Sequence, residues 1–220
     1  MPEDSGPSEI AERILRAAGR CIVRWSVSKA TVSDIAEEAG VSRATLYRAF
    51  PGGRDELIAA LVHDELHRFF GSLAEAIEDS EDLDALLARG LMAARRMVGG
   101  HALYQRVMST EPQLILPMLS IESKEIRALI GEYLRPWVVA RGVPAGPDLD
   151  ELCDYLSRMV LSFIETPGGW DMEDRDAVDH LVRSRFLGAV DDAVRRAAQR
   201  GDAASSAILP HHARGGDSAH

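Results

Sequence analysis

Apolar positions recur at helical spacing along most of the chain, and no segment alternates as a strand would. A first helix is predicted from about residue 10 to residue 24. A long helix is predicted from about Arg54, after residues 51–53, Pro-Gly-Gly, break the chain. Its roughly 25 residues would span ~37 Å at ~1.5 Å per residue. The pattern therefore predicts an all-α protein in which one long helix links two parts.

Two short helices are predicted between these longer ones, on either side of Gly40. Thr31 followed by Asp34 forms a capping box for the first short helix, and Ser42 is the expected cap of the second. The free backbone N–H groups at such helix starts attract phosphate oxygens. Each cap is therefore also a candidate anchor for a nucleic-acid backbone.

The spacing of apolar residues separates a packing face from an exposed face in both short helices. In the second helix, Leu46 and Phe50 form an i, i+4 pair, which leaves Arg43, Tyr47 and Arg48 on the opposite side. Two short helices with a glycine turn and a basic face are typical of a helix-turn-helix that reads DNA. The packing positions of the first short helix are Val32, Ile35, Ala36 and Ala39.

The rest of the chain is predicted to be helical as well, after a polar linker at residues 78–82. Pro136 lies inside one of these helices and is expected to kink it, opening space for a ligand. Asp148 and Asp171 each precede an acidic residue by three positions and are expected to cap the last two helices. The predicted helices cover about 83–98, 103–114, 121–140, 149–164 and 178–194, with disordered ends at 1–7 and 201–220.

Composition excludes several classes of protein. The chain of 220 residues has no apolar run approaching ~20 residues, so no transmembrane helix is predicted. The acidic N-terminus lacks the features of a secretory signal, and a cytoplasmic location is expected. Cys21 and Cys153 fit no metal-binding spacing and are expected to be small core residues. The sequence therefore predicts neither a metal nor a cofactor.

The charge of the chain is unevenly distributed. The formal net charge is −10, which by itself disfavours a nucleic-acid partner. Residues 13–54, however, contain eight basic and three acidic residues, a local balance of +5. A basic head on an acidic body is the distribution expected of a DNA reader with a separate regulatory part.

The run ATVSDIAEEAGVSRATLYRAFPGGRDELI, residues 30–58, closely resembles the DNA-binding headpiece of TetR-family transcriptional regulators. The resemblance covers roughly the first quarter of the chain. It implies a homodimer that represses transcription at a palindromic operator and leaves the DNA when a small molecule enters the body. The family commonly has glycine and then an aromatic residue where this chain has Ser26 and Val27.

Carried over by position, the resemblance implies phosphate contacts, a cap at the groove and a base-facing helix start. Arg43 can make a bidentate contact with guanine, which contributes ~1–3 kcal/mol of base discrimination. Tyr47, Arg48 and Arg54 would instead position the duplex. The predicted DNA-binding residues are Thr31, Ser42, Arg43, Ala44, Thr45, Tyr47, Arg48 and Arg54.

The last two helices are the predicted dimer interface, partly because of the resemblance. Their apolar faces are wider than one neighbour would cover, which favours a four-helix seam between protomers. A purely intrachain core is the alternative. The predicted interface residues are Leu152, Leu156, Val160, Phe163, Val178, Leu181, Val182, Phe186, Val190 and Val194.

A pocket for an apolar or amphipathic effector is predicted inside the body, and the alternative for each lining residue is that it is simply part of the core. The chain has no Gly-rich phosphate loop, G-x-S-x-G or H-E-x-x-H motif, so no enzymatic function is expected. The predicted lining residues are Tyr104, Met108, Met118, Leu134, Trp137, Met159 and Phe163.

Three units are therefore predicted. They are a helix-turn-helix DNA-binding domain at 8–54, a helical ligand-binding and dimerisation domain at 55–200, and a disordered tail at 201–220. The predicted function is that of a homodimeric, ligand-responsive repressor that binds DNA. The alternative is a helical binding or scaffold protein whose headpiece does not read DNA specifically. Weak, sequence-independent binding to duplex DNA would favour this alternative.

Overall fold

The structure is a computed structural model that describes residues 7–114 and 123–207. Every regular element within these ranges is helical, so the predicted all-α class is confirmed. In chain order the elements are α1 (Pro7–Trp25), α2 (Val32–Glu38), α3 (Arg43–Ala49), α4 (Gly53–Ile77), α5 (Leu83–Gly100), α6 (Ala102–Thr110), the short 3-10 helix η1 (Pro112–Leu114), α8 (Lys124–Ala140), α9 (Pro147–Glu165), α10 (Arg175–Leu181), the π-helical segment η2 (Val182–Leu187) and α11 (Gly188–Ala207).

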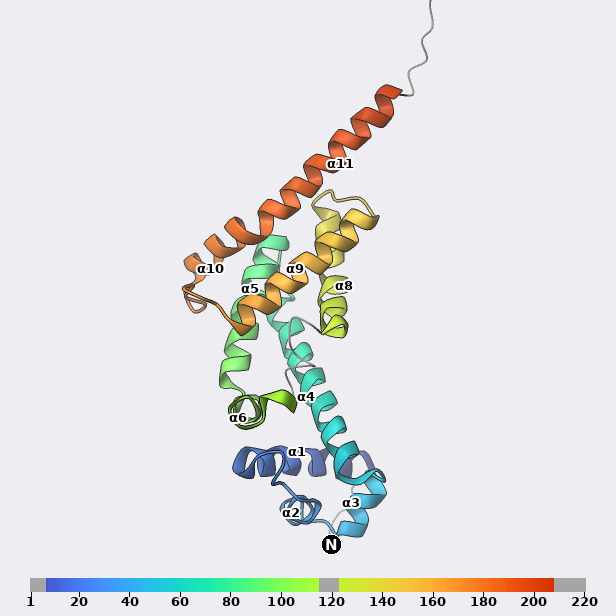
Figure 1. Cartoon of the computed structure of the whole chain (residues 1–220), viewed down its shortest axis with the longest axis vertical. Helices are drawn as coiled ribbons and strands as arrows, with labels where there is room; N and C mark the ends of the chain where they lie inside the picture. The colour runs from blue at the N-terminus through green and yellow to red at the C-terminus, as the bar shows by residue number, and fades with distance from the viewer. Residues whose placement is uncertain (1–6, 115–122, 208–220) are drawn as a thin grey trace, which may run out of the picture.

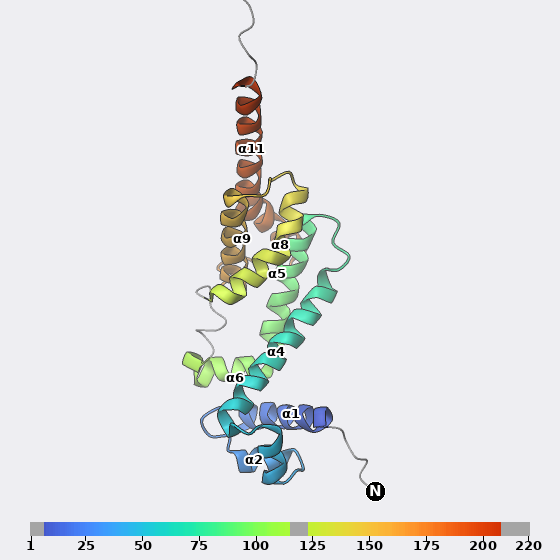
Figure 2. The same cartoon turned by 90° about the vertical axis from the view of Figure 1, so that its right-hand side faces the viewer.

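Helix α4 joins a headpiece, formed by α1–α3, to a body formed by the later helices (Figure 1, Figure 2). It has 25 residues, as its apolar period predicts. Leu57 and Leu61, near its start, are buried in the core of the headpiece, whereas Ile77, at its end, is buried in the core of the body. Because one continuous helix contributes to both cores, a tilt of α4 would move the headpiece relative to the body.

Each part has its own apolar core. Residues from α1, α2, α3 and the start of α4 form the headpiece core, which also takes in Val107 from α6. The body core is built from the end of α4 together with α5, α8, α9, α10, η2 and α11. Cys21 and Cys153 are free thiols buried in the two cores, as expected, and burial raises the pKa of both. Helix α6 is thus the element of the body that packs on the headpiece.

The starts of the last helices differ from the predicted caps. Gly146 is the N-cap of α9, and Pro147 occupies the first helical position, where its fixed φ favours a helix start. Asp148 therefore lies inside the first turn and does not cap. Asp174 caps α10 by accepting the N–H of Asp176 at 3.0 Å, so the predicted cap at Asp171 was three positions too early.

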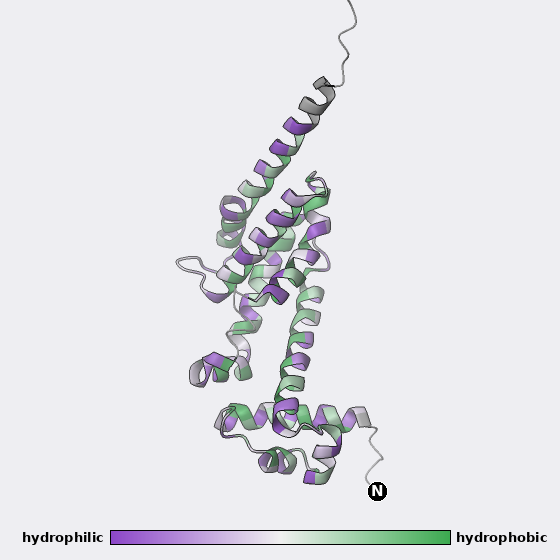
Figure 3. Cartoon of the chain, turned by 45° about the vertical axis from the view of Figure 1, so that its right-hand side comes forward, coloured by the Kyte–Doolittle hydropathy of each residue, from purple (hydrophilic) through white to green (hydrophobic). Residues whose placement is uncertain are grey.

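The final helix is longer than the pattern predicts. Helix α11 continues to Ala207, so residue 201, the predicted start of a disordered tail, lies inside it. Its far end projects beyond the body and carries mostly hydrophilic residues before the uncoloured turns (Figure 3). An apolar face is therefore not what maintains the helix there. The predicted disordered lead at 1–7 ends within α1, which begins at Pro7, and residues 1–6 and 208–220 lie outside the described ranges.

The turn between α1 and α2 contains a serine in the left-handed region of the backbone. Ser26 has φ of +87° and is the one non-glycine residue with positive φ among those the structure describes. Its side chain is 7% exposed. A side chain at this φ costs about 1 kcal/mol relative to glycine. Contacts with neighbouring residues must therefore offset this cost and hold the turn in place.

Candidate nucleic-acid interface

The caps predicted for the two short helices are present. The Thr31 hydroxyl accepts the N–H of Asp34 at 3.2 Å, and the Asp34 carboxylate accepts the N–H of Thr31 at 3.1 Å. Ser42 accepts the N–H of Thr45 at 3.0 Å and so caps α3. Between the helices, Gly40 has φ of +64°, a conformation that favours glycine. Local sequence therefore determines this helix-turn-helix almost entirely.

Helix α3 has the buried and exposed faces that its spacing predicts. Leu46 is fully buried and Phe50 is 6% exposed, so both anchor α3 in the headpiece core. Arg43 and Arg48 are exposed, and neither has a hydrogen bond or ion pair with another described residue. Tyr47 is 43% exposed. The outer face of α3 is thus basic, with two guanidinium groups available to a ligand.

The other predicted contact residues lie around the same face. Ala44 is exposed beside Arg43, and Thr45 is half-buried, with its hydroxyl 2.9 Å from that of Ser42. Thr31 is exposed at the start of α2. These residues and the outer face of α3 are therefore open to solvent together, apart from the partly covered Thr45.

Arg54 is the exception among the predicted DNA contacts. Its Nε donates to the carbonyl of Ala30 at 3.3 Å, and its Nη2 donates to the carbonyl of Val27. The guanidinium group is therefore directed at the turn between α1 and α2. Two of its five donors therefore hold the backbone of that turn, and its contact with a phosphate stays a prediction.

Glu111, which the sequence analysis did not single out, holds the same turn from the body side. Its carboxylate accepts the N–H of Val27 at 2.7 Å and the N–H of Ser28 at 3.0 Å. Glu111 follows α6, so this contact joins the body to the headpiece directly. We call Arg54 and Glu111, with the turn that they hold, the turn clamp. No local pattern points to Glu111, because its partners lie more than 80 positions earlier.

Replacing Glu111 with glutamine is expected to lower the free energy of unfolding by about 1–2 kcal/mol at pH 7, the range for a partly exposed, charge-assisted hydrogen bond. The pKa of the Glu111 carboxyl is lower than its ordinary value. The hydrogen bond with Ser28 is the main cause, and burial opposes it. A lowered folded-state pKa means that the contribution is complete above the unfolded pKa of about 4.3 and is lost as pH falls through the folded pKa.

Urea unfolding of the wild type and Glu111→Gln between pH 3 and pH 7 measures this difference. Glu37→Gln is the matched control, since Glu37 is an exposed headpiece glutamate whose side chain has no hydrogen-bond or ion-pair partner in the described structure. The difference in the free energy of unfolding between the wild type and Glu111→Gln should disappear at the acid end of this pH range. Equal stability of the two proteins at pH 7 would contradict the clamp.

The positive surface of the headpiece is narrower than the count of charges suggests. Arg20 forms an ion pair with Glu38 at 2.6 Å, and the hydrogen bond from Arg20 lowers the pKa of that carboxyl. The Nε of Arg13 is buried and has no hydrogen-bond partner. The +5 balance of residues 13–54 is therefore spread over several faces, and Arg43 and Arg48 supply the charge on α3.

Comparison with known proteins agrees with this geometry. Residues 14–61 match the family model described as "Bacterial regulatory proteins, tetR family". This range covers the packed part of α1, the whole helix-turn-helix and the first turns of α4. The headpiece belongs to the TetR family. The relatives that match are transcriptional regulators and not enzymes, in agreement with the expectation from the missing catalytic motifs.

Curated relatives match different shares of this chain. An uncharacterized HTH-type transcriptional regulator of Mycobacterium tuberculosis (strain ATCC 25618 / H37Rv) is 36% identical over 99 residues, 45% of this chain and 50% of the relative. The chain thus spans about half the length of that relative. A second uncharacterized HTH-type regulator of the same strain is 28% identical over 78% of this chain and 83% of its own length. The probable regulator ArpR of Pseudomonas putida is 40% identical over 36% of each chain.

Solved structures show the same fold at low sequence identity. The TetR family repressor AlkX from Dietzia sp. strain DQ12-45-1b matches with a TM-score of 0.53 and 22% identity, over 82% of this chain and 96% of AlkX. The fatty acid degradation regulator FadR from Bacillus halodurans matches with a TM-score of 0.52 and 17% identity, over 80% and 96%. The arrangement of headpiece and helical body is therefore that of TetR-family structures.

The residues predicted to form the dimer interface are mostly buried in the core of the body. Their side chains pack between α5, α9, α10, η2 and α11 within one chain. Helical period identifies an apolar face but not what covers it, and here neighbouring helices of the same chain cover most of that face. Val160, Phe163 and Val194 remain half-buried against this core. Buried within the single chain are Leu152, Leu156, Val178, Leu181, Val182, Phe186 and Val190.

None of the predicted pocket residues that the structure describes lines either of the two hollows described below. Leu134 is 4% exposed in the body core, and Trp137, Met159 and Phe163 pack against that core. Met118 lies outside the described residues. Tyr104 and Met108 are half-buried on α6, away from the two described hollows.

The space beside Pro136 is polar. A hollow between α8 and α9 is lined mainly by charged side chains, and Arg127 and Asp154 form an ion pair across it at 3.0 Å. The hollow takes in Glu132 and Arg135, the positions just before Pro136 where space for a ligand was expected. Two further absences concern the described part of the chain: no helix in it could cross a bilayer, and no cluster of His, Cys, Asp and Glu in it could hold a metal ion.

Proposed function

We propose that the protein is a DNA-binding transcriptional regulator, a homodimeric repressor whose α3 helices enter successive major grooves of a palindromic operator. The observation that carries this proposal is the exposed outer face of α3, where Arg43 and Arg48 have no partner within the described chain. In this proposal Arg43, Ala44 and Thr45 face the bases. Thr31, Ser42, Tyr47 and Arg48 position the duplex through its phosphates.

The proposed dimer uses the outer faces of α9 and of the helices that follow it. Two headpieces must lie ~34–36 Å apart to enter grooves one turn apart, which a monomer cannot achieve. Tyr155 on α9 is 39% exposed, and its hydroxyl donates to the carbonyl of Arg185 at 3.4 Å. An exposed aromatic residue that bridges α9 and η2 suits the centre of such an interface.

The proposed regulation is release from DNA by a small apolar or amphipathic effector, in the cytoplasm. Two proteins of known structure with the same fold support this class of ligand. AlkX is implicated in the biodegradation of n-alkanes, and one structure of RolR is a complex with resorcinol. The proposed units are a DNA-binding domain at 8–54 and a ligand-binding and dimerisation domain at 55–200, with α11 extending beyond it.

Selection of bound duplexes from a random pool, followed by sequencing, tests the proposal. Two half-sites of inverted sequence, separated by about one helical turn or a multiple of it, are expected. Such a palindrome would report sequence reading and two-fold symmetry together. Weak binding with no enriched sequence would instead favour the alternative, a helical binding or scaffold protein, and a single unrepeated site would contradict the dimer.

A further inference from the structure

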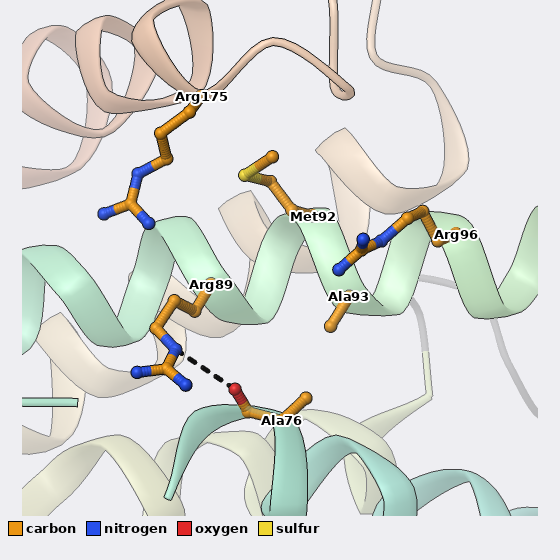
Figure 4. A pocket seen from close by; sticks show the side chains of 6 residues that line it. All are labelled: Ala76, Arg89, Met92, Ala93, Arg96 and Arg175. Carbon is orange, nitrogen blue, oxygen red and sulfur yellow. Dashed lines mark hydrogen bonds between the residues drawn. The ribbon is translucent and has the colours of Figure 1, made fainter. Parts of the chain in front are cut away.

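A surface hollow of about 350 Å³ lies where the end of α4, the middle of α5 and the start of α10 meet. The α5 residues that line it are spaced i, i+3, i+4 and i+7, so they form one stripe along that helix. Side chains from α4 and α10 face the stripe from opposite sides (Figure 4). The lining residues are Ala76, Arg89, Met92, Ala93, Arg96 and Arg175.

The first arginine of the hollow is fixed in place. The Nε of Arg89 donates to the carbonyl of Ala76 at 3.1 Å, which leaves both terminal nitrogens of the guanidinium group with donors to spare. Asp79 lies 3.9 Å from one of them, but its side chain is 91% exposed. Water screens a pair of this kind, so Arg89 keeps most of its positive field inside the hollow.

The other two arginines reach the hollow from opposite directions (Figure 4). Arg175 extends from α10 towards Arg89, and its Nε donates to Asp179 at 2.8 Å. Arg96 extends along α5 over Ala93. It has neither a hydrogen bond nor an ion pair with any residue that the structure describes. Three guanidinium groups therefore share one hollow with a single close carboxylate.

We propose that this hollow binds a small organic anion, a carboxylate or a phosphate monoester, with a short apolar arm. Guanidinium groups offer paired N–H donors that match the oxygens of both anions. Three like charges in one place repel one another, and a bound anion would relieve that repulsion. The rest of the chain is acidic, with a formal net charge of −10, so this arrangement is not a general excess of base.

The apolar part of the lining would contact the apolar arm of the ligand. Met92 is half-buried and adaptable in shape, and Ala93 is buried at 4% exposure between the arginines. A hollow of about 350 Å³ is near the lower end of the range of ligand pockets, ~300–1,000 Å³. The ligand should therefore carry no more than a ring or a short chain beside its anionic group.

Occupation of the hollow would act on the end of α4 that lies farthest from the headpiece. The last carbonyls of a helix lack intrahelical partners, and Arg89 supplies one to Ala76. An anion held by the terminal nitrogens of Arg89 would act on the same side chain whose Nε holds the carbonyl of Ala76, and so on the helix that carries the headpiece. This last step rests on the proposed function, whereas binding of the anion does not.

Titration calorimetry of the full chain without DNA tests the site, with phenyl phosphate and benzoate as probes. Inorganic phosphate and benzyl alcohol are the comparison ligands. The first has the anionic group without an apolar arm, and the second has the apolar ring without an anionic group. At least one of the two probes should bind saturably, about tenfold more tightly than either comparison ligand. The stronger of the two probes identifies the anionic group. No saturable binding, or equal binding of inorganic phosphate, would overturn the proposal.

Arg96→Gln and Arg175→Gln are the informative variants, because both side chains are exposed and their loss should leave the fold intact. Each should weaken binding of the probe by about tenfold, the effect of losing one charge-assisted pair. Arg196→Gln, at an exposed arginine on α11, is the matched control and should bind as the wild type does. Unchanged binding in Arg96→Gln and Arg175→Gln would overturn the site even if the protein proved to read DNA.

Discussion

Replacing Arg43 with alanine is expected to remove most of the protein's preference for its operator over a scrambled duplex. Arg43 is at the first position of α3, exposed and without a partner among the residues that the structure covers. A bidentate pair between arginine and guanine contributes ~1–3 kcal/mol of discrimination. Loss of this pair should narrow the ratio of the two affinities by about fivefold to 150-fold.

Arg48→Ala is the matched comparison, since Arg48 is also exposed and unpaired on the described part of α3. A phosphate contact carries no sequence information, so this variant should weaken binding to both duplexes alike. Its log–log dependence on salt should be shallower by about 0.9 for each phosphate lost. Titrations at several salt concentrations separate the two effects. An undiminished operator preference in Arg43→Ala would refute its base-reading role.

Replacing Phe186 with alanine is expected to lower the free energy of unfolding by about 3–5 kcal/mol, as in other cases where a buried aromatic leaves a cavity. Phe186 is fully buried in the body core, with its ring 5.8 Å from that of Phe163. Residues of the same chain surround the Phe186 side chain. Urea denaturation should therefore show a loss that changes little with protein concentration.

Tyr155→Ala is the contrasting variant, because Tyr155 lies on the outer side of α9 at 39% exposure. Its removal should cost little stability within one chain and should weaken the proposed dimer, which light scattering at micromolar concentrations would report. If the Phe186→Ala variant were instead stable but monomeric, the result would support the prediction that Phe186 lies in the subunit interface.

Features that depend on a few neighbouring residues were predictable from the sequence. The capping box of Thr31 and Asp34, the turn at Gly40 and the buried pair of Leu46 and Phe50 all lie within one stretch of twenty residues. Each is a matter of backbone hydrogen bonds or helical period, which do not depend on the rest of the fold. The headpiece could therefore be predicted almost residue by residue.

Features that depend on distant contacts were not predictable. Arg54 follows a helix break, as a phosphate-binding residue would, but carbonyls 24 and 27 positions earlier use its donors. Glu111 reaches a turn 83 and 84 positions away. The period of α10 and η2 revealed an apolar face at Phe186, yet only the packing of the body shows that its own chain covers that face.

The left-handed Ser26 limits which residues evolution can place at the turn. Glycine would occupy that backbone without penalty, and asparagine would fit better than most side chains, whereas a β-branched residue such as valine would be excluded there. Related sequences should therefore vary at this position only among small or amide-bearing residues, while neighbouring surface positions drift freely.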